Sequence, residues 1–353
     1  MKKYPSLNGL RAISIIIVII HHFSYHGYIP SILQNSKWLY LIFNLLEDGQ
    51  FGVNVFFVIS GFLITSLMLK EDAKTATIGL PHFYIRRVLR IFPAYYTLLL
   101  FYFIVQQFGY IKISNASWAT AITYTKDFNF LAGWDWYTAH GWSLSVEEQF
   151  YLLWPIIFLQ GDTFRKRASV ILFLMVPFLR FFAAIYKIHW VADQSIFTRI
   201  DAISIGCFFA LYKDELLKKI SPYWNIIFYV CIFYFLFFPF IVGLFYKTRF
   251  TAIFVPLLSR HATISNVLIA LIMMYSIFGP QRTWFKFLNL KLVNYIGLLS
   301  YSIYLWQQFF ICKTAFWVNQ FPQNIGMIIV SALVSYHVIE KPFLSLKSKF
   351  SRS

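Results

Sequence analysis

The sequence predicts an all-α integral membrane protein. Of its 353 residues, 59% are hydrophobic, 21% are aromatic and only 13% are charged. Soluble domains are roughly 45–50% apolar and about 25% charged, and a single water-soluble core could not bury this much apolar surface. The composition therefore argues against a soluble enzyme, a disordered chain and a disulfide-stapled secreted domain.

Ten segments are apolar enough to be predicted as membrane-spanning helices, since a span needs about 20 mostly apolar residues. We expect them to surround a central polar cavity. The sixth segment is short, and the fourth contains two acidic residues. The segments are 10–28, 51–69, 91–109, 142–160, 169–187, 196–212, 222–245, 263–279, 293–312 and 324–342.

The charge distribution predicts the orientation of these spans. The chain has 31 Lys and Arg against 14 Asp and Glu, a net charge of +17, but apolar runs such as NVFFVISGFLITSLML are not typical of a nucleic-acid-binding protein. With the N-terminus in the cytoplasm, 21 of the 31 basic residues fall in cytoplasmic segments. This asymmetry follows the positive-inside rule, so we expect both termini to be cytoplasmic.

Residues 1–353 are expected to form a single transmembrane domain without an additional soluble domain. The N-terminal MKKYPSLNGLRAISIIIVII resembles a signal peptide, but no small-residue cleavage site follows it, so we interpret it as a retained first span. The three cysteines are widely spaced in apolar runs and are expected to be buried small side chains.

Ionisable residues within membrane spans are costly and usually functional. In the first span, Arg11 and His22 are eleven residues apart, which is about 1100° of helical rotation and roughly 16 Å of rise. They therefore share one helix face, whereas His21 lies about 100° away from His22. Alternatively, both histidines lie at the membrane interface.

The third span begins with a cluster of arginines. Arg86, Arg87 and Arg90 are three and four residues apart, so they can form one cationic surface at the cytoplasmic mouth. Guanidinium groups bind phosphate bidentately, which makes this surface suitable for a phosphate-bearing ligand. The alternative is a positive-inside segment that contacts lipid headgroups.

The fourth span begins with WSLSVEEQFYLLWP. Ser143, Glu147 and Tyr151 lie on one face, because they are four residues apart. At least one carboxylate of Glu147 and Glu148 should face a polar cavity.

Other polar residues occur in the later spans. Arg199 and Asp201 in the sixth span could pair with charged residues across the bundle. Glu340 and Lys341 close the last span, where we expect a structural role beside Pro342.

Small residues and aromatic residues mark two further features. The SGF at 60–62 and the SYS at 300–302 are expected where helices approach closely. The longest outer segment, 110–141, is rich in Tyr, Trp and Asn, which is consistent with an aromatic interfacial belt or with a sugar-binding surface.

Seven motifs follow one another along nearly the whole chain. They are LNGLRAISIIIVIIHHF, FGVNVFFVISGFLITSLML, RRVLRIFPAYY, WSLSVEEQFYLLWP, RIDAISIGCFFA, YIGLLSYSIYLWQQ and YHVIEKPF. In this order they resemble the acyltransferase-3 family of membrane acyltransferases, which includes bacterial O-acetylases of lipopolysaccharide, peptidoglycan and other surface glycans. The resemblance implies a multi-pass protein of the bacterial cytoplasmic membrane that uses acyl-CoA as cytoplasmic donor and forms an O-acyl glycan.

The resemblance also assigns site residues. Its Arg-x10-His motif falls on Arg11 and His22, its Arg-x-x-Arg motif on Arg87 and Arg90, and its acidic residue on Glu147, with Glu148 second. Family members often have histidine where this chain has Gln307, and we expect Gln307 to orient a substrate hydroxyl. Many relatives carry a C-terminal esterase-like domain, which is not expected here. The full set of expected binding residues is Arg11, Arg86, Arg87, Arg90, Ser143, Glu148, Tyr151, Arg199, Asp201, Tyr301 and Gln307.

These features together predict an acyl transfer. The phosphates of acyl-CoA, most simply acetyl-CoA, would bind the arginines, and His22 would act as general base on an acceptor hydroxyl, with Glu147 orienting the imidazole. The acceptor would be a cell-surface glycan or its lipid-linked precursor, and membrane lipids surround the protein. We expect no permanently bound cofactor, no metal and no nucleic acid. A transporter or flippase, or a non-catalytic scaffold, are the alternatives.

Overall fold

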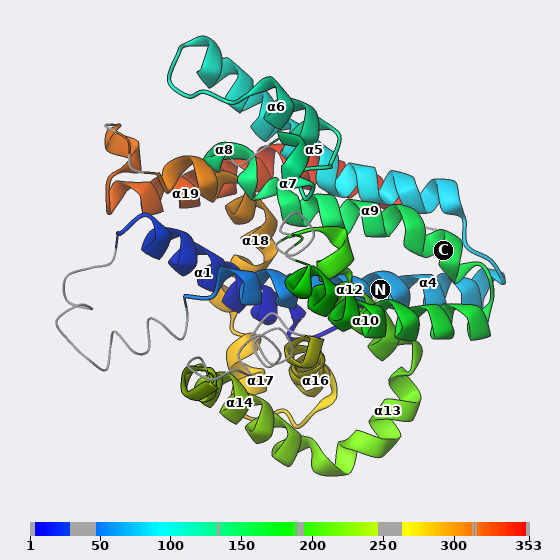
Figure 1. Ribbon diagram of the computed structural model, residues 1–353. Coiled ribbons are helices and arrows are strands. Elements are labelled where there is room, and N and C mark those ends of the chain that lie inside the picture. Colours follow the sequence, from blue (N-terminus) through cyan, green and yellow to red (C-terminus); the bar gives the residue numbers. More distant parts are fainter. Residues whose placement is uncertain are drawn as a thin grey trace.

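The computed structural model describes residues 4–28, 47–132, 135–186, 188, 194–245, 263–312, 314 and 316–350 (Figure 1). Throughout this part every regular element is a helix, which confirms the all-α prediction. Helices suit so apolar a chain because they satisfy their backbone hydrogen bonds internally, without water.

Each of the ten predicted spans overlaps one helix. The last of these helices continues through a π-helical turn, η3 (Ser335–Glu340), into α20 (Lys341–Leu346). The ten helices are α1 (Leu7–Tyr25), α4 (Gly49–Thr75), α5 (Leu80–Gln107), α9 (Gly141–Phe158), α10 (Asp162–Ile185), α12 (Ile196–Leu211), α14 (Trp224–Phe245), α16 (Thr263–Phe278), α18 (Lys291–Phe310) and α19 (Gln323–Val334). The shorter elements are α6 (Asn115–Ile122), α7 (Asn129–Ala132), α8 (Trp136–Ala139), α13 (Lys213–Ile220), η1 (Ser221–Tyr223), α17 (Thr283–Leu288), η2 (Trp317–Asn319) and η4 (Lys347–Phe350).

The helical content is that of a multi-pass membrane protein. Within the described ranges, five helical stretches are long and apolar enough to cross a membrane, and they are Leu7–Tyr25, Gly49–Thr75, Leu80–Gln107, Lys213–Phe237 and Gln323–Leu346. Large apolar side chains such as Phe178 and Tyr229 are exposed on the outside of the bundle, where lipid would cover them. The count of ten crossings and the cytoplasmic position of the termini stay predictions.

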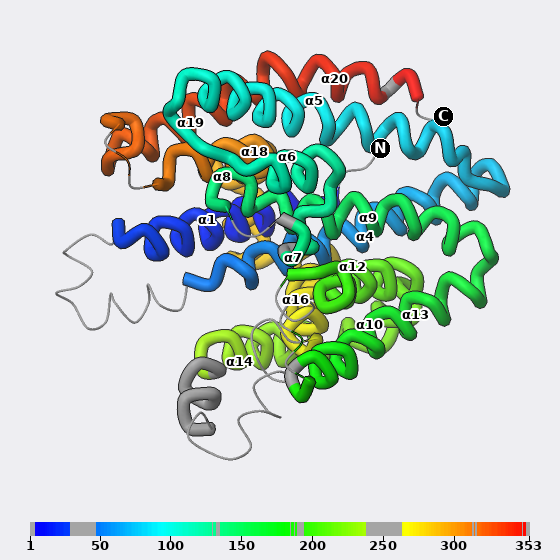
Figure 2. Tube along the Cα trace, turned by 45° about the horizontal axis from the view of Figure 1, so that its top comes forward, coloured from blue at the N-terminus to red at the C-terminus, as the bar shows by residue number. Residues whose placement is uncertain are grey.

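The helices α1 and α4 form the centre of the bundle. α1 packs against both α4 and α18, and α12 packs along α4 and α10. In both views α5 and α20 lie on one side of this centre, and α14 and α16 lie on the other (Figures 1 and 2). Polar residues in the middle of α1 and α4, such as Ser14, Asn54 and Thr65, are therefore buried between helices.

Two glycines allow α4 and α12 to approach closely. A Cβ atom added at Gly61 would lie 1.9 Å from the Ile203 carbonyl oxygen, and one added at Gly206 would lie 2.2 Å from the Val58 carbonyl oxygen. Only glycine fits such backbone contacts between neighbouring helices. The close approach predicted for 60–62 is confirmed.

We expect Gly61→Ala to lower the thermal unfolding temperature of the detergent-solubilised protein, because the added methyl group would force α4 and α12 apart. Overpacking of this kind costs about 1–3 kcal/mol. Gly326→Ala is the matched control, since no atom lies within 4 Å of the position its Cβ would take. Equal unfolding temperatures for the two variants would contradict this account of the helix contact.

Candidate active site

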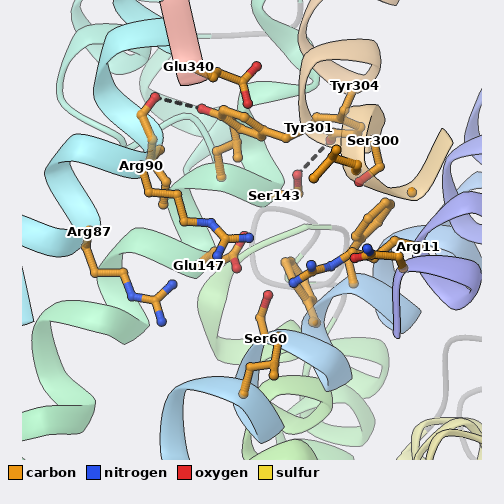
Figure 3. Close-up of a pocket in the computed structure, with 18 of the residues that line it drawn as sticks. Arg11, Ser60, Arg87, Arg90, Ser143, Glu147, Ser300, Tyr301, Tyr304 and Glu340 are labelled. Atoms are coloured by element: carbon orange, nitrogen blue, oxygen red, sulfur yellow. Dashed lines mark hydrogen bonds between the residues drawn. The ribbon is translucent and has the colours of Figure 1, made fainter. Parts of the chain in front are cut away.

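A cavity of about 290 Å³ lies between α1, α4, α5, α9, α18, η3 and α20, and we name it the arginine cavity. Figure 3 shows Arg11 and Arg90 reaching toward its centre from opposite sides, with Glu147 close to the Arg90 guanidinium. Its polar lining residues are Asn8, Arg11, Ser60, Arg87, Arg90, Ser143, Glu147, Tyr151, Ser300, Tyr301, Tyr304, Tyr336 and Glu340.

The spacing on α5 brings two of the three predicted arginines into this cavity. Arg87 and Arg90 are three residues apart, so both point to the same side of the helix. The Arg87 guanidinium carbon lies 4.5 Å from the centre of the Tyr151 ring, a cation–π contact. Arg11 on α1 is within electrostatic range of Arg90, Arg87 and Glu147.

Arg86 does not line the arginine cavity, which corrects the prediction of one continuous surface of three arginines. Its Nη2 atom pairs with the Glu71 carboxylate at 2.8 Å, and its Nη1 atom donates to the Phe350 carbonyl oxygen at 2.8 Å. Adjacent residues on a helix point about 100° apart, so Arg86 and Arg87 cannot both face the same space. Arg86 instead connects α5 to α4 and η4.

The face predicted on α9 lines the arginine cavity. The Tyr151 hydroxyl donates a hydrogen bond to the Glu147 carboxylate, and the Ser143 hydroxyl lies 2.7 Å from the Tyr304 hydroxyl. Glu148 does not line the cavity. Its Oε1 atom is buried and has no hydrogen-bond partner among the described residues. The geometry therefore favours Glu147 as the carboxylate that can meet a substrate.

The last helices close the arginine cavity with two more polar groups. The Tyr301 hydroxyl donates to the Ile91 carbonyl oxygen at 2.9 Å, so the ring is fixed against α5. Glu340 accepts a hydrogen bond from the Ser302 hydroxyl and lies within electrostatic range of Arg90. Glu340, expected to be structural beside Pro342, thus also contributes negative charge to the cavity lining.

A second cavity, of about 160 Å³, contains the predicted histidine, and we name it the histidine cavity. The His22 ring lies 5.4 Å from the Trp136 ring in an edge-to-face contact. Trp136 is held by reciprocal bonds with Gln308, because its indole donates to the Gln308 carbonyl at 2.8 Å and the Gln308 amide donates back at 2.7 Å. The polar and aromatic lining residues are His21, His22, Tyr25, Gln50, Trp136, His140, Trp142, Gln194, Tyr304 and Gln308.

His140 is a lining residue of the histidine cavity that the sequence analysis missed. Its ring is buried, and neither ring nitrogen has a hydrogen-bond partner among the residues that the structure describes. Its position directly before the helix that begins GWSLS was a possible signal. Although three histidines line this cavity, no group of three or more His, Cys, Asp or Glu within the described ranges could hold a metal ion.

The two cavities meet at a shared wall. Val53 and Tyr304 line both of them. The Tyr304 hydroxyl, whose oxygen lies beside Ser143, donates to the His140 carbonyl oxygen at 2.9 Å. Arg11 lines the arginine cavity, and both His22 and His21 line the histidine cavity, although His21 was expected on a different face of α1.

The structure does not bring Glu147 to His22, which corrects the expected pairing of carboxylate and imidazole. The two side chains line different cavities, because Glu147 lies at the depth of Arg11 rather than of His22. The neighbour of the His22 ring is the fully buried Gln307 amide. The Nδ1 atom of His22 has no hydrogen-bond partner within the described part of the chain.

Arg199 and Asp201, the two charged residues of α12, have different structural roles. Arg199 donates to the Gln50 side-chain oxygen at 2.7 Å, and its guanidinium lies 5.9 Å from the Trp142 ring, so it supports two lining residues of the histidine cavity. Asp201 lines neither cavity. It is fully buried and receives bonds from Arg180 at 2.9 Å, Thr263 at 2.7 Å and Asn266 at 3.0 Å, which tie together α10, α12 and α16.

Known proteins resemble this chain over nearly its full length. A peptidoglycan O-acetyltransferase OatA of Listeria monocytogenes is 25% identical and matches 100% of this chain but 56% of its own length. An O-acetyltransferase OatA of Staphylococcus aureus (strain NCTC 8325) is 30% identical and matches 96% of this chain but 57% of its own length. The chain thus spans little more than half of these relatives. No solved structure matches it.

The family described as "Acyltransferase domain" matches residues 4–339, a stretch that contains both cavities except for the lining residues Glu340 and Leu344. The resemblance that the sequence motifs indicated is therefore confirmed. The chain belongs to this family of membrane acyltransferases.

Proposed function

We propose that this protein is a membrane O-acyltransferase that transfers an acyl group, most simply acetyl, from acyl-CoA to a hydroxyl of a cell-surface glycan or its lipid-linked precursor. The observation that carries the proposal is the pair of cavities, one lined by three arginines and one by histidines, that meet at Val53 and Tyr304. A reaction between two different substrates needs two such sites side by side. The names of the relatives, which include a peptidoglycan O-acetyltransferase, support a glycan acceptor.

The arginine cavity suits the donor. Coenzyme A carries several phosphate groups, and the guanidinium groups of Arg87, Arg90 and Arg11 can bind phosphate oxygens in pairs. The basic residues of this part of the chain indicate that the cavity opens toward the cytoplasm, where acyl-CoA is made. Its volume of about 290 Å³ would accept the thioester arm and leave the nucleotide at the mouth.

The histidine cavity suits a sugar. Trp136 and Trp142 offer aromatic surfaces to the apolar face of a pyranose ring, and Gln50 and Gln308 offer amide groups to its hydroxyls. Trp136 belongs to the aromatic-rich segment 110–141, so this segment contributes to the acceptor site as well as to an interfacial belt. A cavity of about 160 Å³ would hold one sugar unit of a longer glycan.

The chemistry takes place at the shared wall. His22 accepts the proton of the acceptor hydroxyl while its oxygen attacks the thioester carbonyl carbon. The tetrahedral oxyanion then collapses, the C–S bond breaks, and the leaving thiolate takes the proton from His22. The Tyr304 and Ser143 hydroxyls lie closest to the shared wall, and either one would have to turn away from the His140 carbonyl oxygen to donate a hydrogen bond to the oxyanion. Gln307, beside His22, would orient the imidazole in the way first expected of Glu147.

Transport is the weaker alternative. Charged residues in a helical bundle also line solute pathways, but membership of the acyltransferase family does not favour that reading. Incubation of membranes with labelled acetyl-CoA separates the two functions, because an enzyme places the label in a glycan, whereas a transporter moves an unmodified solute.

We expect His22→Ala to reduce acyl transfer by about 100-fold to 10,000-fold, the usual contribution of a general base. The measurement is the transfer of labelled acetyl from acetyl-CoA to glycan by detergent-solubilised protein. His337→Ala is the control, because that histidine is exposed and its Nε2 bonds Tyr295 at 3.0 Å, away from both cavities. Turnover by the His22 variant at the level of the His337 variant would exclude the general-base role.

We expect the double variant Arg87→Gln, Arg90→Gln to weaken coenzyme A binding by at least about 10-fold, since each guanidinium would lose charge-assisted bonds to phosphate. Binding is measured by isothermal titration calorimetry in detergent. The double variant Arg282→Gln, Lys286→Gln is the control, because it removes two exposed positive charges from another predicted cytoplasmic segment. Unchanged affinity in the first double variant would mean that Arg87 and Arg90 serve membrane topology alone.

A further inference from the structure

The segment after the last span covers one end of the arginine cavity. Leu344 of α20 lines the cavity, and Lys347 follows it by three residues, on the same side of the helical path. η4 packs on α5, and the bond from Arg86 to the Phe350 carbonyl oxygen fixes it there. Lys347 is thereby held beside the end of the cavity that Leu344 lines, which we take as its mouth.

Lys347 lies among positive charges. Its ammonium group is within electrostatic range of Arg11, Arg86, Arg87 and Arg90. The side chain is half-buried, and no carboxylate lies within ion-pair distance of it among the described residues. Lysine in a cationic surrounding is unfavourable unless a polyanion binds there.

The pKa of Lys347 reflects the positive charges around it. Burial, and then repulsion by the four arginines, lowers the pKa of Lys347 to about 7. A bound phosphate group would offset the repulsion and favour the protonated ammonium. Glu71 and Glu340 are bonded to Arg86 and Ser302 rather than to Lys347.

We propose that Lys347 is a phosphate-binding residue of the donor site and contacts the nucleotide phosphates of acyl-CoA together with Arg87 and Arg90. The proposal rests on the proposed function, because it assigns a further residue to the same donor. The arginines line the deep part of the cavity, and Lys347 extends the cationic surface outward to its mouth. Lysine suits the outer end of the donor site, because it places a single positive charge on a flexible side chain. The nucleotide phosphates would bind there, at the end of acyl-CoA farthest from the thioester.

The experiment compares two ligands that differ only in the nucleotide part. Binding of coenzyme A and of pantetheine, which lacks the nucleotide phosphates, is measured by isothermal titration calorimetry on the full chain in detergent. We expect Lys347→Gln to weaken coenzyme A binding by about tenfold, the effect of one charge-assisted contact, and to leave pantetheine binding unchanged. Lys347→Arg should retain coenzyme A binding, because it keeps the charge.

Lys349→Gln is the matched control. It removes one positive charge from an exposed side chain two residues after Lys347, so the affinity for coenzyme A should not change. Equal coenzyme A affinity in Lys347→Gln and the wild-type protein would overturn the inference and leave the proposed function standing. If Lys347→Gln weakens the binding of coenzyme A and of pantetheine equally, the inference is also overturned, because the substitution would then have changed the shape of the cavity mouth rather than removed a phosphate contact. If the wild-type protein does not bind coenzyme A, the proposed function itself fails.

Discussion

The arginines that project into the bundle impose the main constraint on this structure. Charged side chains within a membrane span cost about 2.5–3.5 kcal/mol or more at the bilayer centre, so Arg11, Arg87 and Arg90 need a polar space between the helices. The lining supplies it through the Tyr151 ring over Arg87 and the carboxylates of Glu147 and Glu340. Seven helical elements contribute to this space, which explains why polar motifs interrupt otherwise apolar spans.

The helix α1 connects the two cavities and sets the distance between them. Arg11 and His22 lie on one face, roughly 16 Å apart along the axis, and Tyr304 stands at the wall between their cavities. A donor held by its phosphates near Arg11 must therefore extend an arm toward His22 for the reaction to occur. The long, thin thioester arm of acyl-CoA fits this requirement, whereas a compact phosphate ligand would not reach the imidazole.

The sequence allowed some features of the fold and site to be predicted and hid others. Apolar runs placed the helices, and the rotation of 100° per residue related Arg11 to His22 because both lie on one helix. The same reasoning could not separate Arg86 from Arg87, since either can share a face with Arg90. It could not show that Glu147 lies away from His22 either, because periodicity within one helix says nothing of its depth relative to another. Those relations come from helix packing.

The number of hydrogen-bond partners that a buried polar residue has helps to distinguish structural residues from candidate functional residues. Asp201 receives bonds from three side chains, is fully buried and lines neither cavity, so it stabilises the packing of α10, α12 and α16 and is out of reach of a substrate there. His140 is also buried, but neither of its ring nitrogens has a hydrogen-bond partner among the described residues. A buried polar group without a partner costs about 1–3 kcal/mol. Such a group adds nothing to stability, and on the proposed function a sugar bound in the histidine cavity would supply the missing bonds.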